Sequence, residues 1–98
     1  MSHRGPGSAR AADRLEIKNR LGLHARAAAL LVQTVARFDA EISVSKDDQM
    51  VNGKSILGLM MLAAGQGSCI DVVAQGADAQ AALDAIRTLV EAKFHEEA

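Results

Sequence analysis

Apolar and polar side chains alternate along three stretches of the 98-residue chain. Apolar residues recur at every second position over residues 15–17, over residues 41–46 and over residues 69–74. This period of two predicts strands that each bury one face and leave the other face in water. A short fourth strand is predicted at residues 50–51, because the polar residues 47–49 before it favour a hairpin turn.

A period of three to four residues, which is typical of an amphipathic helix, occupies other segments of the chain. It predicts one helix over residues 25–38 and a last helix that starts at Asp78 and carries an apolar stripe up to Val90. The segment SILGLMML, residues 55–62, is predicted to be a short helix, because Ser55 is a good N-cap.

Three residues of this short helix are enough to form its buried face. We expect Ile56, Leu59 and Met60 to face the core, which leaves Leu57 and Met61 with less obvious burial. Exposed leucine and methionine side chains are adaptable and make good protein-binding surface. The alternative, that a small core uses all of these side chains, stays open.

The predicted strands and helices follow one another in the order βαββαβα. Alternating strands indicate a sheet with one solvated face, which favours antiparallel pairing. We therefore predict an α/β (α+β) two-layer open-faced sandwich, in which three helices cover one face of a four-stranded antiparallel sheet. Residues 1–12 contain Gly5-Pro6-Gly7-Ser8 and are predicted to be a flexible N-terminal extension, and residues 13–98 are predicted to form one domain.

Composition argues against several classes of function. The net charge is −1 and the only aromatic residues are Phe38 and Phe94, so nucleic-acid binding is not expected. The apolar runs are too short to cross a membrane, and the first residues lack the apolar segment of a secretory signal. We expect a cytoplasmic protein without membrane insertion.

The titratable residues show no pattern of a metal or thiol site. His24, Cys69 and His95 lack the spacing of metal ligands, so neither a metal nor another cofactor is expected. The single cysteine cannot form an intramolecular disulfide. A solvated acidic face is the simplest interpretation of Glu91, Glu96 and Glu97.

The stretch GLHARAAAL, residues 22–30, places His24 where a turn becomes a helix. The N-terminus of a helix has unpaired N–H groups and a partial positive charge, so it binds anions. A neutral imidazole is a nucleophile, and Arg26 adds a positive charge with donors suited to phosphate oxygens. These residues predict a histidine that accepts a phosphoryl group. The alternative is a surface histidine that only caps the helix.

A second candidate lies at residues 52–55, NGKS. Gly53-Lys54-Ser55 is similar to the end of a nucleotide-binding P-loop, but Asp48 stands where that loop requires a glycine. We therefore exclude a nucleotide site of this type. Ser55 remains a candidate for phosphorylation, because the helix dipole stabilises a phosphate at the start of a helix.

Together these motifs resemble the HPr family, the small histidine-containing phosphocarriers of the bacterial phosphoenolpyruvate-dependent phosphotransferase system (PTS). LGLHARAAA, residues 21–29, resembles the phosphohistidine site of the family, and NGKSILGLMML, residues 52–62, resembles its regulatory-serine segment. The interval between His24 and Ser55 matches, as does the order βαββαβα. The resemblance covers about residues 13–94.

The resemblance implies that His24 accepts a phosphoryl group on Nδ1 from phospho-enzyme I and passes it to an enzyme IIA-type protein, while Arg26 attends the group. It implies that Ser55 matches the serine that HPr serine kinase/phosphorylase modifies in some bacteria, which weakens transfer through the histidine. Such a protein is a covalent phosphotransfer intermediate rather than a stand-alone enzyme, and we expect a monomer. The predicted partner-binding residues are Ala25, Ala27, Ile56, Leu57, Met60 and Met61.

The chain also departs from the family pattern. Ala27 stands where proline is usual and would fix the first helical turn. Asn19-Arg20-Leu21 stands where many members have a small polar residue, and Leu21 cannot hydrogen-bond the imidazole. LGLHARAAA and FDAEISV resemble the nitrogen-related branch, whereas SILGLMML is closer to the branch with the regulated serine, so the pathway stays open.

Two other functions compete with the phosphocarrier. One is a regulatory binding module that is controlled mainly by phosphorylation of Ser55, and the other is a small α/β interaction domain without phosphochemistry. The presence of both His24 and Arg26 argues against a purely regulatory member.

Overall fold

The structure of the chain is a computed structural model that describes residues 9–96. Residues 1–8, which make up most of the predicted extension, and residues 97–98 lie outside the described part. The elements follow the chain as β1 (Arg10–Glu16), α1 (Ala25–Val35), β2 (Glu41–Lys46), β3 (Gln49–Asn52), α2 (Ile56–Met61), β4 (Cys69–Gln75), α3 (Ala79–Glu91) and the 3-10 helix η2 (Lys93–His95).

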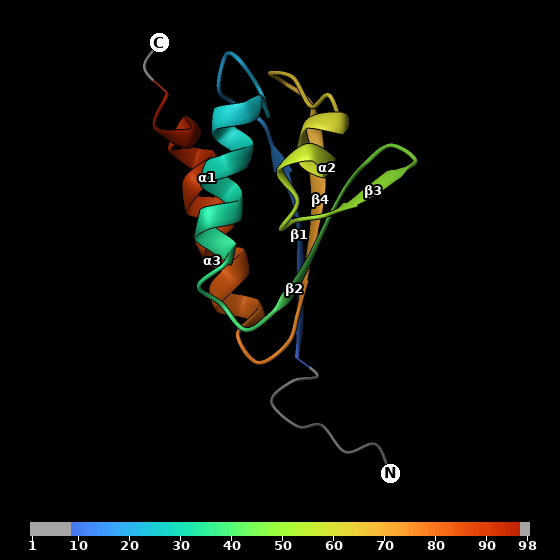
Figure 1. The fold of residues 1–98 in the computed structure, drawn as a ribbon, viewed down its shortest axis with the longest axis vertical. Helices are drawn as coiled ribbons and strands as arrows, with labels where there is room; N and C mark the ends of the chain where they lie inside the picture. The colour runs from blue at the N-terminus through green and yellow to red at the C-terminus, as the bar shows by residue number, and fades with distance from the viewer. Residues whose placement is uncertain (1–8, 97–98) are drawn as a thin grey trace.

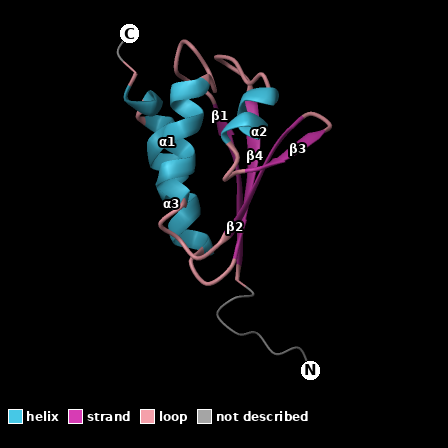
Figure 2. Ribbon diagram, viewed as in Figure 1, coloured by secondary structure: helices cyan, strands magenta, loops and turns pink. Residues whose placement is uncertain are grey.

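The four strands form one sheet in the order β1-β4-β2-β3, and every neighbouring pair is antiparallel. Leu15 pairs with Ile70 across β1 and β4, and Val44 pairs with Val72 across β2 and β4. The helices lie together on one side of this sheet, with α1 and α3 next to each other (Figures 1 and 2). The predicted open-faced sandwich of order βαββαβα is therefore confirmed.

The core is aliphatic and fills the space between the sheet and the helices. The two central strands, β2 and β4, bury alternate residues, as the period of two predicts, and α3 buries the stripe predicted for it. The largest fully buried apolar side chains are those of Ile17, Leu31, Val35, Val44, Leu59, Leu62, Ile70, Val72, Leu83, Ile86 and Val90.

The first strand begins earlier than the sequence pattern indicates. Arg10 already pairs with Gln75 of β4, so residues 10–12 belong to the sheet and not to an extension. The pattern missed them because the small side chains of Ala11 and Ala12 give a weak alternation. Helix α1 ends at Val35, before the predicted residue 38, and the backbone N–H of Phe38 donates to the Val35 carbonyl in a tighter turn.

Helix α2 buries a different face from the one predicted. Leu59 and Leu62 are buried, whereas Ile56 is 42% exposed and Met60 is 40% exposed. The prediction that Ile56 and Met60 face the core is therefore wrong. A helix of six residues can direct only a narrow stripe inward, and here Leu59 is its one buried residue, followed on the same side by the C-cap Leu62 three positions later. Four apolar side chains of residues 56–61 remain at the surface as a result.

Two leucines of α2 provide a matched test of this arrangement. We expect Leu59→Ala to lower the free energy of unfolding by about 2–5 kcal/mol, because it leaves a cavity in the core. Leu57 is 69% exposed, so Leu57→Ala should change the free energy of unfolding by less than about 0.5 kcal/mol. Urea unfolding of both variants measures the difference, and equal losses would contradict the described orientation of α2.

Candidate functional site

The imidazole of His24 caps the N-terminus of α1. His24 has an extended backbone, and its Nδ1 accepts a hydrogen bond of 3.3 Å from the backbone N–H of Arg26. Its carbonyl oxygen accepts the first helical bond, from the N–H of Ala28, at 2.8 Å. The Nδ1 lone pair therefore points toward the unpaired amides and the partial positive charge at the start of the helix.

The loop before His24 is fixed against the loop that follows α2. Gly22 adopts φ +70°, and a Cβ at this position would lie 2.4 Å from the carbonyl oxygen of Ala64, so the close approach requires glycine. The N–H of Leu23 donates to the same carbonyl oxygen at 2.9 Å, and the Leu23 side chain is buried. These contacts hold His24 beside residues 63–65.

A cleft of about 490 Å³ opens at this end of α1. It is lined by Leu21, His24 and Arg26, which lie at or just before the start of α1, and by Phe94, His95 and Glu96 from the C-terminal segment. Arg26 is exposed, and no carboxylate of residues 9–96 lies within 4.0 Å of its guanidinium. The guanidinium is therefore available to an anion that enters the cleft.

Glu96 is part of this site and not of a solvated acidic face, so that prediction is wrong for Glu96. Its Oε1 accepts a hydrogen bond of 2.8 Å from the buried amide of Asn19, and its Oε2 lies 3.3 Å from the Leu21 N–H. The same Oε1 lies 4.0 Å from Nε2 of His24. No pattern in the sequence indicates this contact, since Glu96 and His24 are distant in the chain and share no periodic element.

These partners stabilise the charged form of the Glu96 carboxylate. The hydrogen bond from Asn19, followed by the bond from the Leu21 N–H and the charges of His24 and Arg20, holds the pKa of Glu96 below its ordinary value, although partial burial opposes this. Asn19 also donates to the Gly22 carbonyl at 2.9 Å, so one buried side chain joins the C-terminal segment to the loop before His24.

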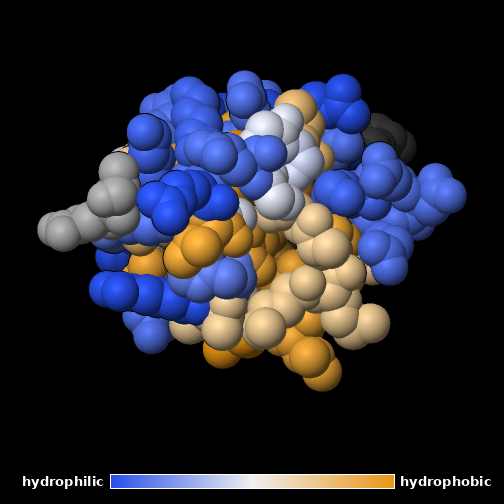
Figure 3. Space-filling model, turned by 90° about the horizontal axis from the view of Figure 1, so that it is seen from above, coloured by the Kyte–Doolittle hydropathy of each residue, from blue (hydrophilic) through white to orange (hydrophobic). Residues whose placement is uncertain are grey.

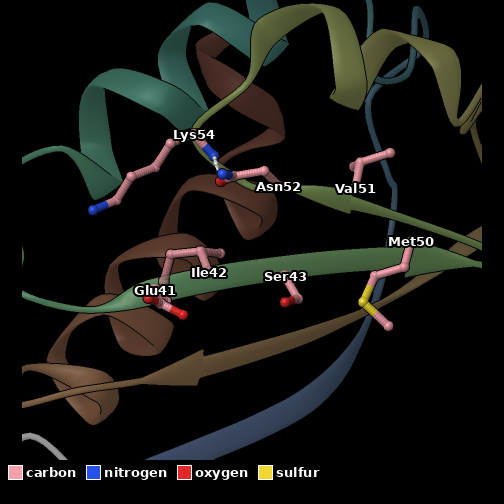
Figure 4. A pocket seen from close by; sticks show the side chains of 7 residues that line it. All are labelled: Glu41, Ile42, Ser43, Met50, Val51, Asn52 and Lys54. Atoms are coloured by element: carbon pink, nitrogen blue, oxygen red, sulfur yellow. Dashed lines mark hydrogen bonds between the residues drawn. The ribbon is translucent and has the colours of Figure 1, made fainter.

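Ser55 is the N-cap of α2, as predicted. Its Oγ accepts a hydrogen bond of 3.0 Å from the N–H of Gly58, and the residue is half-buried. The turn before it is shaped by Asn52, whose Oδ1 accepts a bond of 2.8 Å from the Lys54 N–H (Figure 4). The hollow shown in Figure 4 lies along β2 and β3, and neither His24 nor Arg26 lines it.

Apolar side chains are exposed close to the His24 cleft. We call the exposed residues Leu21, Ile56, Leu57, Met60 and Met61 the apolar rim. Figure 3 views this end of the molecule and shows apolar residues gathered over part of it, next to polar ones.

The two alanines that are predicted to bind a partner differ in their exposure to solvent. Ala25 is exposed at the start of α1. Ala27 is fully buried in the core, so the prediction that it contacts a partner is wrong. Residues two positions apart on a helix face different directions, which explains the difference. Helix α1 begins at Ala25 although its first turn contains Ala27 and not the proline expected there from the resemblance.

Two kinds of feature are absent from the described residues. Within residues 9–96, no three His, Cys, Asp or Glu side chains come together in a way that could hold a metal ion. No helix in this part of the chain is long and apolar enough to span a membrane. Cys69 is exposed and has a free thiol.

Comparisons with known proteins identify the family of the chain. Residues 11–92 match the family model of the PTS HPr component phosphorylation site. The chain belongs to the HPr family. It is 49% identical over 83 residues to the phosphocarrier protein HPr of Treponema pallidum, which covers 85% of this chain and 94% of that protein.

Members of both named branches of the family are similar to this chain. The phosphocarrier protein NPr of Shewanella violacea is 50% identical over 80 residues, covering 82% of this chain and 88% of the relative. The crystal structure of HPr-C-His from Thermoanaerobacter tengcongensis superimposes with a TM-score of 0.85 at 46% identity, covering 90% of this chain and 99% of that one. The chain is therefore a member of the HPr phosphocarrier family of the PTS. It is similar both to relatives named HPr and to one named NPr, so these comparisons do not assign it to one branch of the family.

The lowered pKa of Glu96 predicts how the C-terminal segment responds to acid. A carboxyl group whose pKa is lowered in the folded state contributes stability above its unfolded pKa and loses it as the pH falls through the folded value. We expect the contact with Leu21 to be intact near neutral pH and to be lost only at a pH below the ordinary pKa of a glutamate side chain. The chemical shift of the Leu21 amide in an NMR titration follows this change.

A control variant separates this effect from general acid unfolding. In Glu96→Gln the Leu21 amide should show no titration in the same range, while β-sheet amides should behave as in the original protein. A titration that persists in Glu96→Gln would contradict the assignment.

Proposed function

We propose that the chain accepts a phosphoryl group on Nδ1 of His24 from phospho-enzyme I and passes it to an enzyme IIA-type protein. The supporting observation is the orientation of the imidazole. Nδ1 faces the N-terminus of α1, where backbone N–H groups and Arg26 can hold the oxygens of a phosphoryl group. The cleft is open to solvent, so a bound phosphoryl group stays accessible to an acceptor.

The transfer exchanges one N–P bond for another. The Nδ1 lone pair of His24 attacks the phosphorus atom of the donor phosphohistidine, and the bond between phosphorus and the donor nitrogen breaks with its electron pair returning to the donor ring. The onward step runs the same exchange with His24 as the donor and a histidine of the acceptor as the nucleophile. Neither step requires a metal or a cofactor of this chain.

Loss of the nucleophile tests this proposal. Incubation with phosphoenolpyruvate and enzyme I should give the protein acid-labile phosphate, as is typical of phosphohistidine, and His24→Ala should abolish it. His95→Ala removes the other described histidine, which also lines the cleft, and should retain the label because the nucleophile is still present. Phosphate on His24→Ala, or a label that resists acid, would contradict transfer through His24.

We further propose that the apolar rim and its basic neighbours form the docking surface for both PTS partners. Exposed methionine and leucine side chains can adapt to more than one partner. Arg20 and Arg26 are exposed at the same end of the molecule and favour an acidic partner surface. Ser55 lies at the start of the helix that carries four residues of the rim, so a kinase that phosphorylates Ser55 would place a dianion at its edge.

Charge at Ser55 should therefore weaken docking. We expect Ser55→Asp to lower the rate of enzyme I-dependent phosphotransfer by on the order of tenfold, because a carboxylate would repel an acidic partner. The matched control is Ser55→Asn, because aspartate and asparagine have similar size and are both good N-caps for the Gly58 N–H, and only aspartate adds a charge. A rate for Ser55→Asp equal to that of Ser55→Asn would remove the regulatory role.

Other features of the proposal follow from the family and the fold. We propose a cytoplasmic monomer. The edge strand β1 carries the charged residues Arg10, Arg14 and Glu16, and the other edge strand, β3, is only four residues long. Charged side chains and short length each disfavour pairing between the sheets of two molecules. Two solved relatives are described as dimers, one an HPr and one a Crh protein, so light scattering is the direct measurement. Acid-stable phosphate that depends on ATP and a kinase, without labelling through enzyme I, would instead support a regulatory module.

A further inference from the structure

The carboxylate of Glu96 faces the ring nitrogen of His24 that the proposed transfer does not use. Oε1 of Glu96 lies 4.0 Å from Nε2, while Nδ1 points the other way, to the Arg26 N–H. The carboxylate cannot drift freely, because Asn19 and the Leu21 N–H both bind it. A negative charge held next to one nitrogen of a neutral imidazole favours the tautomer that carries its proton there.

We propose that Glu96 is a positioning residue for His24: its carboxylate keeps the proton on Nε2, so that Nδ1 presents its lone pair to the incoming phosphoryl group. This inference rests on the proposed function and deepens it. It assigns a role to a C-terminal glutamate that the phosphohistidine and regulatory-serine motifs do not contain.

The contact between Glu96 and His24 also affects the charge that develops during the transfer. When Nδ1 attacks phosphorus, the Nε2 proton stays where it is and the ring gains a positive charge, while the donor ring takes back the electron pair of the broken N–P bond. A carboxylate near Nε2 stabilises that positive charge. When the phosphoryl group moves on, the N–P electron pair returns to Nδ1 and the ring is neutral again with its proton still on Nε2.

The backbone that leads to Glu96 is strained, which indicates that its position is held by specific contacts. Lys93, Phe94 and His95 have φ values of 57°, 54° and 58°, in the left-handed region that residues with a side chain avoid. Such strain persists only where the surroundings determine the conformation. Here the Phe94 side chain is buried in the core, and the Glu96 carboxylate is bound at the start of α1.

Asn19 connects the Glu96 carboxylate to the loop before His24. Its amide is buried and bridges the Gly22 carbonyl and the Glu96 carboxylate, with both bonds donated by Nδ2. The residue therefore links the loop that positions the imidazole to the group that faces the imidazole. The distance between Glu96 and His24 is set by this bridge rather than by a direct hydrogen bond.

The experiment measures the tautomer of His24 and the transfer rate on the same proteins. The variants are Glu96→Gln, which removes the charge, and Glu91→Gln, which removes the charge of an exposed glutamate on α3. Long-range ¹H–¹⁵N NMR spectra of the protein alone, at about pH 8.5 where an ordinary imidazole is neutral, give the ratio of the two tautomers. Single-turnover phosphorylation by phospho-enzyme I gives the rate.

We expect the Nε2–H tautomer to dominate in the original protein and in Glu91→Gln. In Glu96→Gln the ratio of Nε2–H to Nδ1–H should fall about three- to fivefold, as expected for a partly exposed charge contact, and the rate should fall by a similar factor. An unchanged tautomer ratio, an unchanged rate or a faster rate in Glu96→Gln would each overturn the proposal.

The two readouts separate this inference from the proposed function. The tautomer ratio needs no PTS partner, so it tests the role of Glu96 even if enzyme I does not phosphorylate the original protein. Conversely, phosphorylation of His24 with a tautomer ratio that ignores Glu96 would leave the phosphocarrier proposal in place and reject Glu96 as a positioning residue.

Discussion

The hydrogen bond from the Leu23 N–H to the Ala64 carbonyl oxygen is the constraint on which the site depends. It closes the loop before α1 onto the loop after α2, at a point where only glycine fits at position 22. Two further backbone bonds, between Ile17 and residues 67–68, continue this contact to the end of β1. Because of these bonds, the helix cap and the exposed side chains of α2 face the same end of the molecule.

The sequence was sufficient for the elements and for the central residues of the site. Alternation in the strands and the apolar stripe of α3 are strong signals, and they predicted the sheet and the helices that cover it. His24 and Ser55 could be placed at helix starts because capping depends on local chemistry. Such local rules act within a few residues and can be followed along the chain.

Features that depend on tertiary packing could not be predicted in this way. Whether Ile56 or Leu62 is buried depends on how a six-residue helix is rotated against the sheet, which its uniformly apolar sequence does not specify. Ala27 was misplaced for a related reason, since a small apolar residue fits a core as well as a surface. Glu96 was missed because its partners, Asn19 and Leu21, belong to the other end of the chain.

The flexible thioethers of Met60 and Met61 bear on how long a complex would last. A relay of the proposed kind has to meet two differently shaped proteins in turn and leave each one quickly, so tight binding would slow turnover. Unbranched methionine side chains lose rotamer freedom when they are held, which limits affinity while allowing several fits. The absence of exposed large aromatic anchors among residues 9–96 works in the same direction, toward short residence times and rapid exchange.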